Sequence, residues 1–174
     1  MLTTTHLAVA VLLGMLMNLD RDEWFVALTF GLFLDIDHLF AAPRYVSDNG
    51  WGALLAPTWE DGSGLPWKSA FHHPEGAFIV GYLSVGWRLC IPLLFWGSHL
   101  ALDELQLATL DHSAIVESAV LAAALGGILW VGYWRWSRLE PGEDFLGFLR
   151  HLATRISSVL SPTARKVRRR SDTT

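Results

Sequence analysis

The chain has almost no cysteine and few charged side chains. Cys90 is the single cysteine among 174 residues, which excludes an intrachain disulfide and any metal site built from several thiolates. We expect Cys90 to pack as a small buried hydrophobe. Charged residues make up 17% of the chain, below the soluble norm of about 25%. Hydrophobic residues make up 52% and include nine Trp and nine Phe. This composition indicates a single-domain integral membrane protein.

The N-terminus lacks the basic region of a cleavable signal peptide, and an apolar run begins within its first few residues. We therefore expect this run to remain as a membrane segment. Apolar runs recur along the chain and predict an all-α integral membrane bundle of about five short helices. The five predicted segments cover residues 3–19, 24–40, 71–88, 91–105 and 113–136.

The third and fourth segments are short, because a helix needs about 20 residues to span a bilayer. Residues 76–90 and 91–105 therefore form either a hairpin or one long kinked helix. Pro92 disfavours a continuous helix. A hairpin also returns His99 to the side of the membrane that holds His72. We therefore predict the hairpin.

Five crossings sort the polar side chains at the segment ends by type. The His and Asp residues fall at one membrane face, and most Lys and Arg residues fall at the other. Because Lys and Arg concentrate on the cytoplasmic side, we expect an inner-membrane protein whose His and Asp residues face outward and whose C-terminus is cytoplasmic. The cations predicted at the cytoplasmic face are Arg21, Arg88, Arg135, Arg138 and those of the C-terminal tail.

The C-terminal region differs from the rest of the chain. Apolar residues recur at helical spacing over 145–160 and predict an amphipathic helix lying on the membrane surface. The basic run 165–170 follows, and such a run is attracted to anionic lipid. Nucleic-acid binding is the rival interpretation of this run, and we expect no nucleic-acid partner. We therefore divide the chain into a membrane-embedded metal-site domain, 1–138, and a cytoplasmic helix and tail, 139–174.

His99 and Asp103 are the most informative pair of the sequence. They lie four residues apart in an apolar run, so a helix places them one turn apart on one face. Burying such groups without partners costs roughly 2–7 kcal/mol. Imidazole and carboxylate suit a divalent metal, with zinc as the first expectation and manganese as the second. The alternative is a hydrogen-bonded pair that packs helices. Partners at the edges of apolar segments are His6, Asp35, Asp37, His38, His72, His73 and His112.

Asp35, Asp37 and His38 form a second polar cluster. On a helix Asp35 and His38 share a face, whereas Asp37 points about 200° away from Asp35. If the helix ends there, both carboxylates turn inward, and one could bind metal while the other orients water. The alternative is a polar helix end that is solvated at the interface.

His72 and His73 precede Pro74, which favours an extended or turn conformation at His73. Neighbouring side chains then point apart, so we expect one histidine to ligate metal and the other to contact substrate. His6 stands alone at a helix start, where it is either a ligand or an interfacial residue.

A loop of about thirty residues separates the second and third segments. It contains Trp51, Trp59 and Trp67, and tryptophan is enriched at membrane interfaces. We therefore expect this loop to be an ordered external cap. Its two cations, Arg44 and Lys68, are predicted on the outward face and are candidates for binding a phosphate.

Four short motifs, in this order, resemble the YdjM-like family of predicted inner-membrane metal-dependent hydrolases. They are Thr5-His6, Leu34-Asp35-Ile36-Asp37-His38, His72-His73 and Ser98-His99-Leu100-Ala101-Leu102-Asp103. The family is distantly similar to zinc-dependent phospholipase C and to zinc-dependent single-strand nucleases. The resemblance covers residues 1 to about 105 and implies an all-helical fold. The zinc ligands that it implies are His6, Asp35 or Asp37, His72 or His73, His99 and Asp103.

The chain also departs from the family pattern. Leu34 stands where the family commonly has Pro, and the chain has His72-His73-Pro74-Glu75-Gly76 where the family usually shows His-Arg-Gly with a later Thr-His-Ser. The residues and the resemblance together predict metal-dependent hydrolysis of a phosphoester, with a lipid or lipid-linked substrate, in which Asp35 or Asp37 accepts the proton of water. The alternative is a non-catalytic small membrane subunit whose His and Asp residues are structural. Transport of metal is a third hypothesis, which the crowding of ligands at one face disfavours. The sequence leaves the oligomeric state open.

Overall fold

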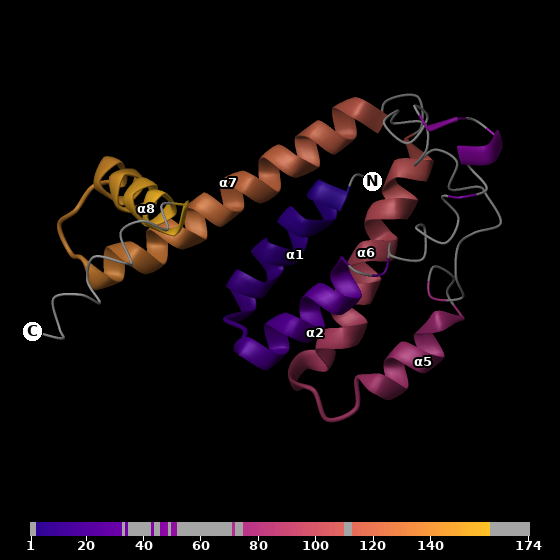
Figure 1. The fold of residues 1–174 in the computed structure, drawn as a ribbon. Helices are drawn as coiled ribbons and strands as arrows, with labels where there is room; N and C mark the ends of the chain where they lie inside the picture. The colour runs from indigo at the N-terminus through magenta and orange to yellow at the C-terminus, as the bar shows by residue number, and fades with distance from the viewer. Residues whose placement is uncertain are drawn as a thin grey trace, which may run out of the picture. The chain divides into compact units, whose positions relative to one another are not determined.

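The protein is all-helical wherever the structure describes it. In this computed structural model the described residues are 3–32, 34, 43, 46–48, 50–51, 71, 75–109 and 113–160. The helices are α1 (Thr3–Met17), α2 (Arg21–Gly31), α5 (Gly76–Leu83), the 3₁₀ helix η5 (Arg88–Cys90), α6 (Ile91–Ala108), α7 (Ser113–Leu139) and α8 (Phe145–Leu160) (Figure 1). The all-α prediction is confirmed for these residues.

Helix length limits what can cross a membrane. Within the described residues, one helix is long and apolar enough to do so, over Ala114–Leu139 in α7. The 15 residues of α1 and the 11 of α2 span about 22 and 16 Å, against a hydrocarbon core of about 30 Å. The lengths therefore give one candidate span. Five membrane crossings therefore stay a prediction.

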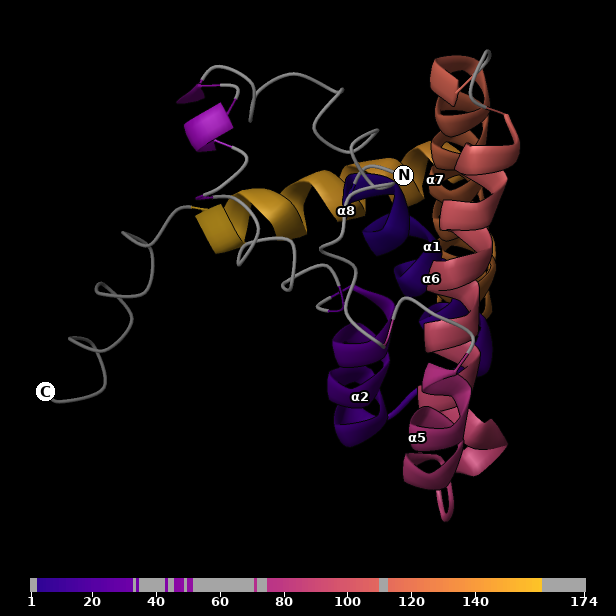
Figure 2. The same ribbon diagram turned by 90° about the vertical axis from the view of Figure 1, so that its right-hand side faces the viewer.

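Contacts divide the chain into two compact units, residues 1–128 and 129–174, and the boundary falls within α7. In the first unit, α2 packs against α6 and α1, and α5 packs against α6 (Figures 1 and 2). The core of this unit lies between α1, α2 and α6. Its buried members are Ala10, Leu19, Ala27, Ile91 and Phe95.

Glycines let these helices approach closely. A Cβ at Gly14 would overlap the Trp24 ring, so the indole packs directly on the backbone of α1. A Cβ at Gly31 would lie 3.1 Å from the Phe95 ring and 3.3 Å from Ala10. The absence of a side chain at Gly31 therefore brings the end of α2 against α6.

The turn between α1 and α2 is built from its charged residues. Asn18, with φ 53°, follows the end of α1. Asp20 then caps α2, because its carboxylate accepts from the backbone N–H of Asp22 and Glu23 and its own N–H donates to the Glu23 side chain. The apolar pattern predicts that the second segment begins at residue 24. The helix begins at Arg21 instead, because the capping box of Asp20 and Glu23 stabilises its first turn.

The predicted hairpin is confirmed, since α5 and α6 are separate helices joined by a turn. The Ser84 hydroxyl donates to the Val80 carbonyl and accepts from the backbone N–H of Leu93, at 2.7 and 2.9 Å. Pro92 lies in the first turn of α6, where the absence of an N–H costs no hydrogen bond. Cys90 is exposed in the turn, so the expectation that it is buried is wrong. Cys90 is the residue that precedes the first turn of α6, outside the buried helix–helix contacts.

Arg88 joins the two turns. Its guanidinium donates to both carboxylate oxygens of Glu23, at 2.8 and 2.7 Å, and to the carbonyls of Met17 and Asn18. These hydrogen bonds, with one from the Asp20 backbone, lower the pKa of Glu23 from 4.5 to about 2. The α1–α2 and α5–α6 turns therefore lie at one end of the first unit, called here the turn end. This agrees with the predicted placement of Arg21 and Arg88 together.

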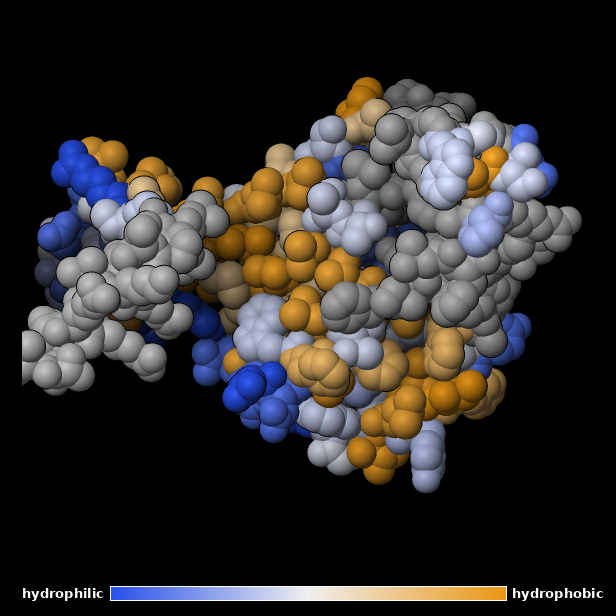
Figure 3. Space-filling model, in the orientation of Figure 1, coloured by the Kyte–Doolittle hydropathy of each residue, from blue (hydrophilic) through white to orange (hydrophobic). Residues whose placement is uncertain are grey.

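Much of the surface of the first unit is apolar (Figure 3). Phe78, Tyr82 and Val85 on α5 and its turn are highly exposed, as are Leu89 in the turn and Ile115 on α7. Large exposed apolar areas on a protein mark contact with lipid or with another chain.

Candidate metal centre

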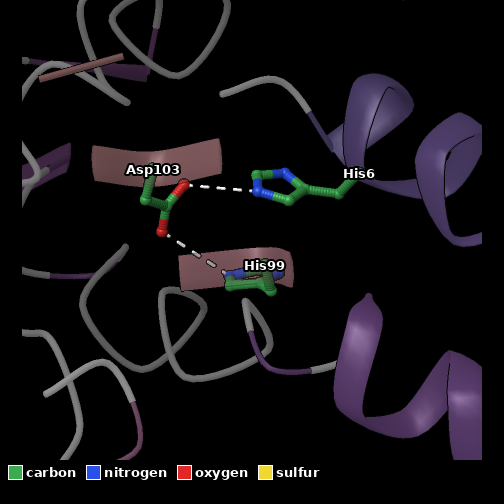
Figure 4. Close-up of side chains that lie close together, drawn as sticks. All are labelled: His6, His99 and Asp103. Atoms are coloured by element: carbon green, nitrogen blue, oxygen red, sulfur yellow. Dashed lines mark ion pairs between the residues drawn. The ribbon is translucent and has the colours of Figure 1, made fainter. Parts of the chain in front are cut away.

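Three potential metal ligands converge at the other end of α1 and α6. They are His6 on α1 and His99 and Asp103 on α6, and one ligand atom of each lies within 4.8 Å of the others (Figure 4). His99 and Asp103 lie one turn apart, as their spacing predicts. The third residue comes from a helix far away in sequence. We call this group the His–Asp triad.

The carboxylate of Asp103 faces both imidazoles of the triad. Its Oδ1 lies 3.3 Å from His6 Nε2, and its Oδ2 lies 3.6 Å from His99 Nε2. The two rings are stacked, with centroids 4.1 Å apart and planes at 26°. His6 and His99 are each 1% exposed, whereas the Asp103 side chain is 16% exposed. The triad is therefore reached from solvent at its carboxylate.

A backbone carbonyl orients one of the two rings. His99 Nδ1 lies 3.3 Å from the Gly31 oxygen at the end of α2. A carbonyl can only accept, so Nδ1–H is the donor, and the other ring nitrogen, Nε2, faces Asp103. The contact between Nε2 and the carboxylate oxygen is favourable when a proton or a cation lies between them. Ligating histidines in metal sites commonly donate their other N–H to a carbonyl in this way.

The separations of the ligand atoms fit a small divalent cation. Zinc–nitrogen and zinc–oxygen bonds are about 2.0–2.1 Å long, which places two tetrahedral ligand atoms about 3.3 Å apart. His6 Nε2 lies 3.3 Å from Asp103 Oδ1 and His99 Nε2 lies 3.6 Å from Asp103 Oδ2, which are two different oxygens of the carboxylate, and one ligand atom of each residue lies within 4.8 Å of the others. Two imidazoles and one carboxylate are also a donor set that catalytic zinc uses. The residues present therefore fit a metal ion, and they leave its identity open.

Contacts around the triad explain why the three residues meet. Thr5 is fully buried, and its hydroxyl donates to Glu117 Oε1 at 2.9 Å, which holds the start of α1 against the start of α7. Gly31 fits closely against Phe95, one turn before His99. From the sequence, Thr5 enters only through the Thr5-His6 motif, Glu117 is a weak candidate because its spacing from His112 suits a helix poorly, and Gly31 carries no signal. A carboxylate in an apolar helix signals a polar partner, and Glu117 is such a residue.

A further contact anchors the chain that precedes α5. Trp96 Nε1 donates to the Phe71 carbonyl at 2.7 Å. Trp96 lies one turn before His99 on α6, so the backbone at Phe71 is held beside this part of α6. Phe71 directly precedes His72 in sequence.

The structure brings together three of the predicted ligands, His6, His99 and Asp103. The predictions for the remaining site residues fall outside the described part of the chain and stay predictions. These residues are Asp35, Asp37, His38, Arg44, Lys68, His72, His73 and His112.

The triad is also the feature from which a function has to be inferred. Comparisons of the chain with protein-family models, with curated proteins and with solved structures found no match. The inference of function therefore rests on the ligand chemistry and burial of the triad itself.

Proposed function

We propose that this protein is a membrane-embedded, metal-dependent hydrolase that acts on a phosphoester, with a lipid or lipid-linked molecule as substrate. The observation that carries the proposal is the His–Asp triad, whose three ligand atoms lie within 4.8 Å of one another. Ionisable groups inside apolar helices are costly and are usually functional.

In this proposal α1, α2, α5, α6 and α7 form the membrane bundle. Support comes from the long apolar stretch of α7 and from the exposed apolar side chains of α5. The turn end, with Arg21 and Arg88, faces the cytoplasm because cations concentrate there. The triad lies at the opposite end of α1 and α6 and faces outward in the inner membrane.

His6, His99 and Asp103 would hold the metal ion, with zinc as the first expectation and manganese as the second. When bound, a divalent ion supplies Lewis acidity toward a phosphoryl oxygen and lowers the pKa of a water ligand toward about 7. His99 contributes Nε2, since the Gly31 carbonyl takes up its Nδ1–H. Asp103, whose side chain is more exposed than those of the two histidines, would supply the oxygen ligand.

Two anchored backbone positions support the participation of the remaining predicted residues. Gly31, whose carbonyl contacts His99, precedes Asp35 by four residues, and four extended residues span at most about 14 Å. Phe71, held by Trp96, directly precedes His72.

We assign the undescribed predicted residues their roles by chemistry. Asp35 or Asp37 accepts the proton of the attacking water, and the other carboxylate binds metal. His38 and one of the pair His72 and His73 complete the ligands. Arg44 and Lys68 neutralise the phosphate. A site at the end of an apolar bundle suits an amphiphilic substrate that stays in the bilayer.

A structural role for the triad is the second candidate. Both imidazoles are buried and stacked, and Asp103 contacts both within 3.6 Å, so the group could simply join α1 to α6 in a non-catalytic subunit. A hydrolase turns over a phosphoester, whereas a structural subunit does not. If the protein is a hydrolase, removing the carboxylate of Asp35 or Asp37 abolishes turnover and leaves the fold intact. If the cluster is structural, the same change disrupts the fold.

The test is hydrolysis of phospholipid and lipid-linked phosphoesters by the reconstituted protein with zinc or manganese, measured as water-soluble product released from the lipid, either a headgroup or inorganic phosphate. We expect turnover that Asp35→Asn or Asp37→Asn abolishes while the melting temperature is retained. Asp48→Asn, at an exposed aspartate to which no role in the site is assigned, is the matched control and should keep full activity. Absence of metal-dependent turnover on every phosphoester tested, with metal bound, would overturn the hydrolase proposal.

A further inference from the structure

The second unit contains an amphipathic helix whose apolar arc has two parts. One part packs on the end of α7. Phe145 and Phe148 contact Tyr133 with ring centroids 5.3 and 5.9 Å apart, and Phe148 also lies 5.7 Å from Trp136. The Asp144 side chain accepts from the backbone N–H of Gly147 and caps the start of α8. These contacts hold α8 against α7 through the aromatic part of the arc.

The other part of the arc is not used for this packing. Leu146, Leu149, Ala153 and Ile156 follow each other at spacings of three and four residues and form one stripe, called here the outer strip. Leu146 is 53% exposed and Ile156 is 52% exposed. A stripe of this kind requires an apolar partner from outside the unit.

Cations lie along both borders of the apolar arc. With about 100° per residue, Arg150 lies about 40° beyond Leu146, and Arg155 lies about 20° beyond Phe148 on the other side. Both arginines are exposed. Long cationic side chains at the borders of an apolar face are typical of helices that lie in a membrane interface.

The charge of the C-terminal region identifies the partner further. Residues 145–174 contain seven of the 13 Lys and Arg of the chain but one of its 17 Asp and Glu. Five of these cations fall within 165–170. The spacing of the outer strip would also suit a coiled coil of two copies. Two copies would bring their basic segments together, however, whereas an anionic bilayer offers both an apolar layer and the opposite charge.

We propose that the outer strip of α8 docks on the surface of an anionic lipid bilayer. Leu146, Leu149 and Ile156 enter the interface, and the arginines at the borders contact lipid phosphates. The basic run 165–170 adds attraction that depends on anionic lipid and falls with salt. This proposal rests on the second unit and is independent of the metal centre.

The experiment uses the full chain, with Cys90→Ser, reconstituted in phosphatidylglycerol-containing vesicles. An environment-sensitive fluorophore is attached at Ile156→Cys on the outer strip or at Ser158→Cys, which lies about 160° away on the same helix. We expect lipid-borne quenchers to quench the first label about threefold more than the second. We also expect this contrast to shrink in pure phosphatidylcholine or at high salt.

Two results would overturn the proposal. Equal quenching of both labels in anionic vesicles would place the outer strip outside the bilayer. Shielding of the Ile156→Cys label that is lost when the protein is diluted into excess lipid would identify a second copy as the occupant. The variant with Arg168, Arg169 and Arg170 changed to Gln should lose part of the contrast, and an unchanged contrast in this variant would contradict the role of the basic run.

Discussion

The two ends of the first unit are each held by a polar cluster that joins distant segments, and the clusters differ in their chemistry. At the turn end, Arg88 and Glu23 balance each other in charge, and the guanidinium also satisfies the carbonyls of Met17 and Asn18. At the other end, two imidazoles face one carboxylate, and the Gly31 carbonyl accepts from His99 Nδ1, so that Nε2 faces Asp103. The first cluster has the composition of a structural clamp. The second has the composition of a metal site.

The largest expected effect comes from removing the carboxylate of the triad. Asp103→Ala should weaken zinc binding by at least about 100-fold, because changes in the groups that merely orient ligands already cost 10–100-fold. Titration with a competing chelator measures this affinity. Glu104→Ala, at the exposed carboxylate next in sequence, is the control and should bind zinc like the wild type. Equal affinities of the two variants would place the metal elsewhere.

Gly31→Ala tests whether the backbone carbonyl of Gly31 supports the metal centre by orienting His99. The added Cβ would lie 3.1 Å from the Phe95 ring and 3.3 Å from Ala10 Cβ, so these neighbours or the end of α2 must give by a few tenths of an ångström, and a shift of α2 would move its carbonyl relative to His99. We expect zinc affinity to fall by about 10–100-fold and stability by about 1–3 kcal/mol. Calorimetric titration and thermal unfolding measure the two effects.

Gly97→Ala is the matched control for this change. It adds the same methyl group to α6, where nothing lies within 4 Å of the new Cβ. Stability should rise by about 0.5–1 kcal/mol and zinc affinity should stay unchanged. Similar losses of affinity at both glycines would show that the Gly31 carbonyl has no special role.

Arg88→Ala should destabilise the contacts at the turn end and leave the triad intact. It removes the partner of the nearly buried Glu23 side chain and the donor to two carbonyls at the end of α1. We expect a lower melting temperature and an unchanged number of bound metal ions. A loss of metal that matches the loss of stability would show that the two ends are not separate in function.

The smallest expected effect is the pH dependence of the turn end. The pKa of Glu23 is about 2 in the folded protein and 4.5 without its partners, so its contribution is complete above pH 4.5. It is lost as the pH falls from 4.5 toward 2, because the unfolded chain then binds the proton more readily. Melting temperatures at pH 7 and pH 3 should differ more for the wild type than for Glu23→Gln. An equal difference in the two proteins would show that Glu23 does not contribute to the pH dependence of stability.

The sequence predicted those features that depend on spacing along the chain. The four-residue separation of His99 and Asp103 and the position of Pro92 gave the ligand pair and the hairpin, and both are present. Spacing carries no information on which distant backbone or side chain completes a cluster. The contacts of Arg88 with Glu23 and of Gly31 with His99 depend on how helices pack. His6 is placed with His99 and Asp103 by the order of the short motifs that carry the family resemblance, because spacing alone leaves it as either a ligand or an interfacial residue.

Metal content tests the central claim most directly. Plasma mass spectrometry on the detergent-purified protein should find at least about one equivalent of zinc or manganese. The double variant His99→Ala/Asp103→Ala should lose it, whereas His151→Ala/Glu104→Ala, at exposed residues of the same types, should retain it. Absence of metal from the wild type, even after divalent ions are supplied, would contradict the assignment and leave the triad as a structural contact between α1 and α6.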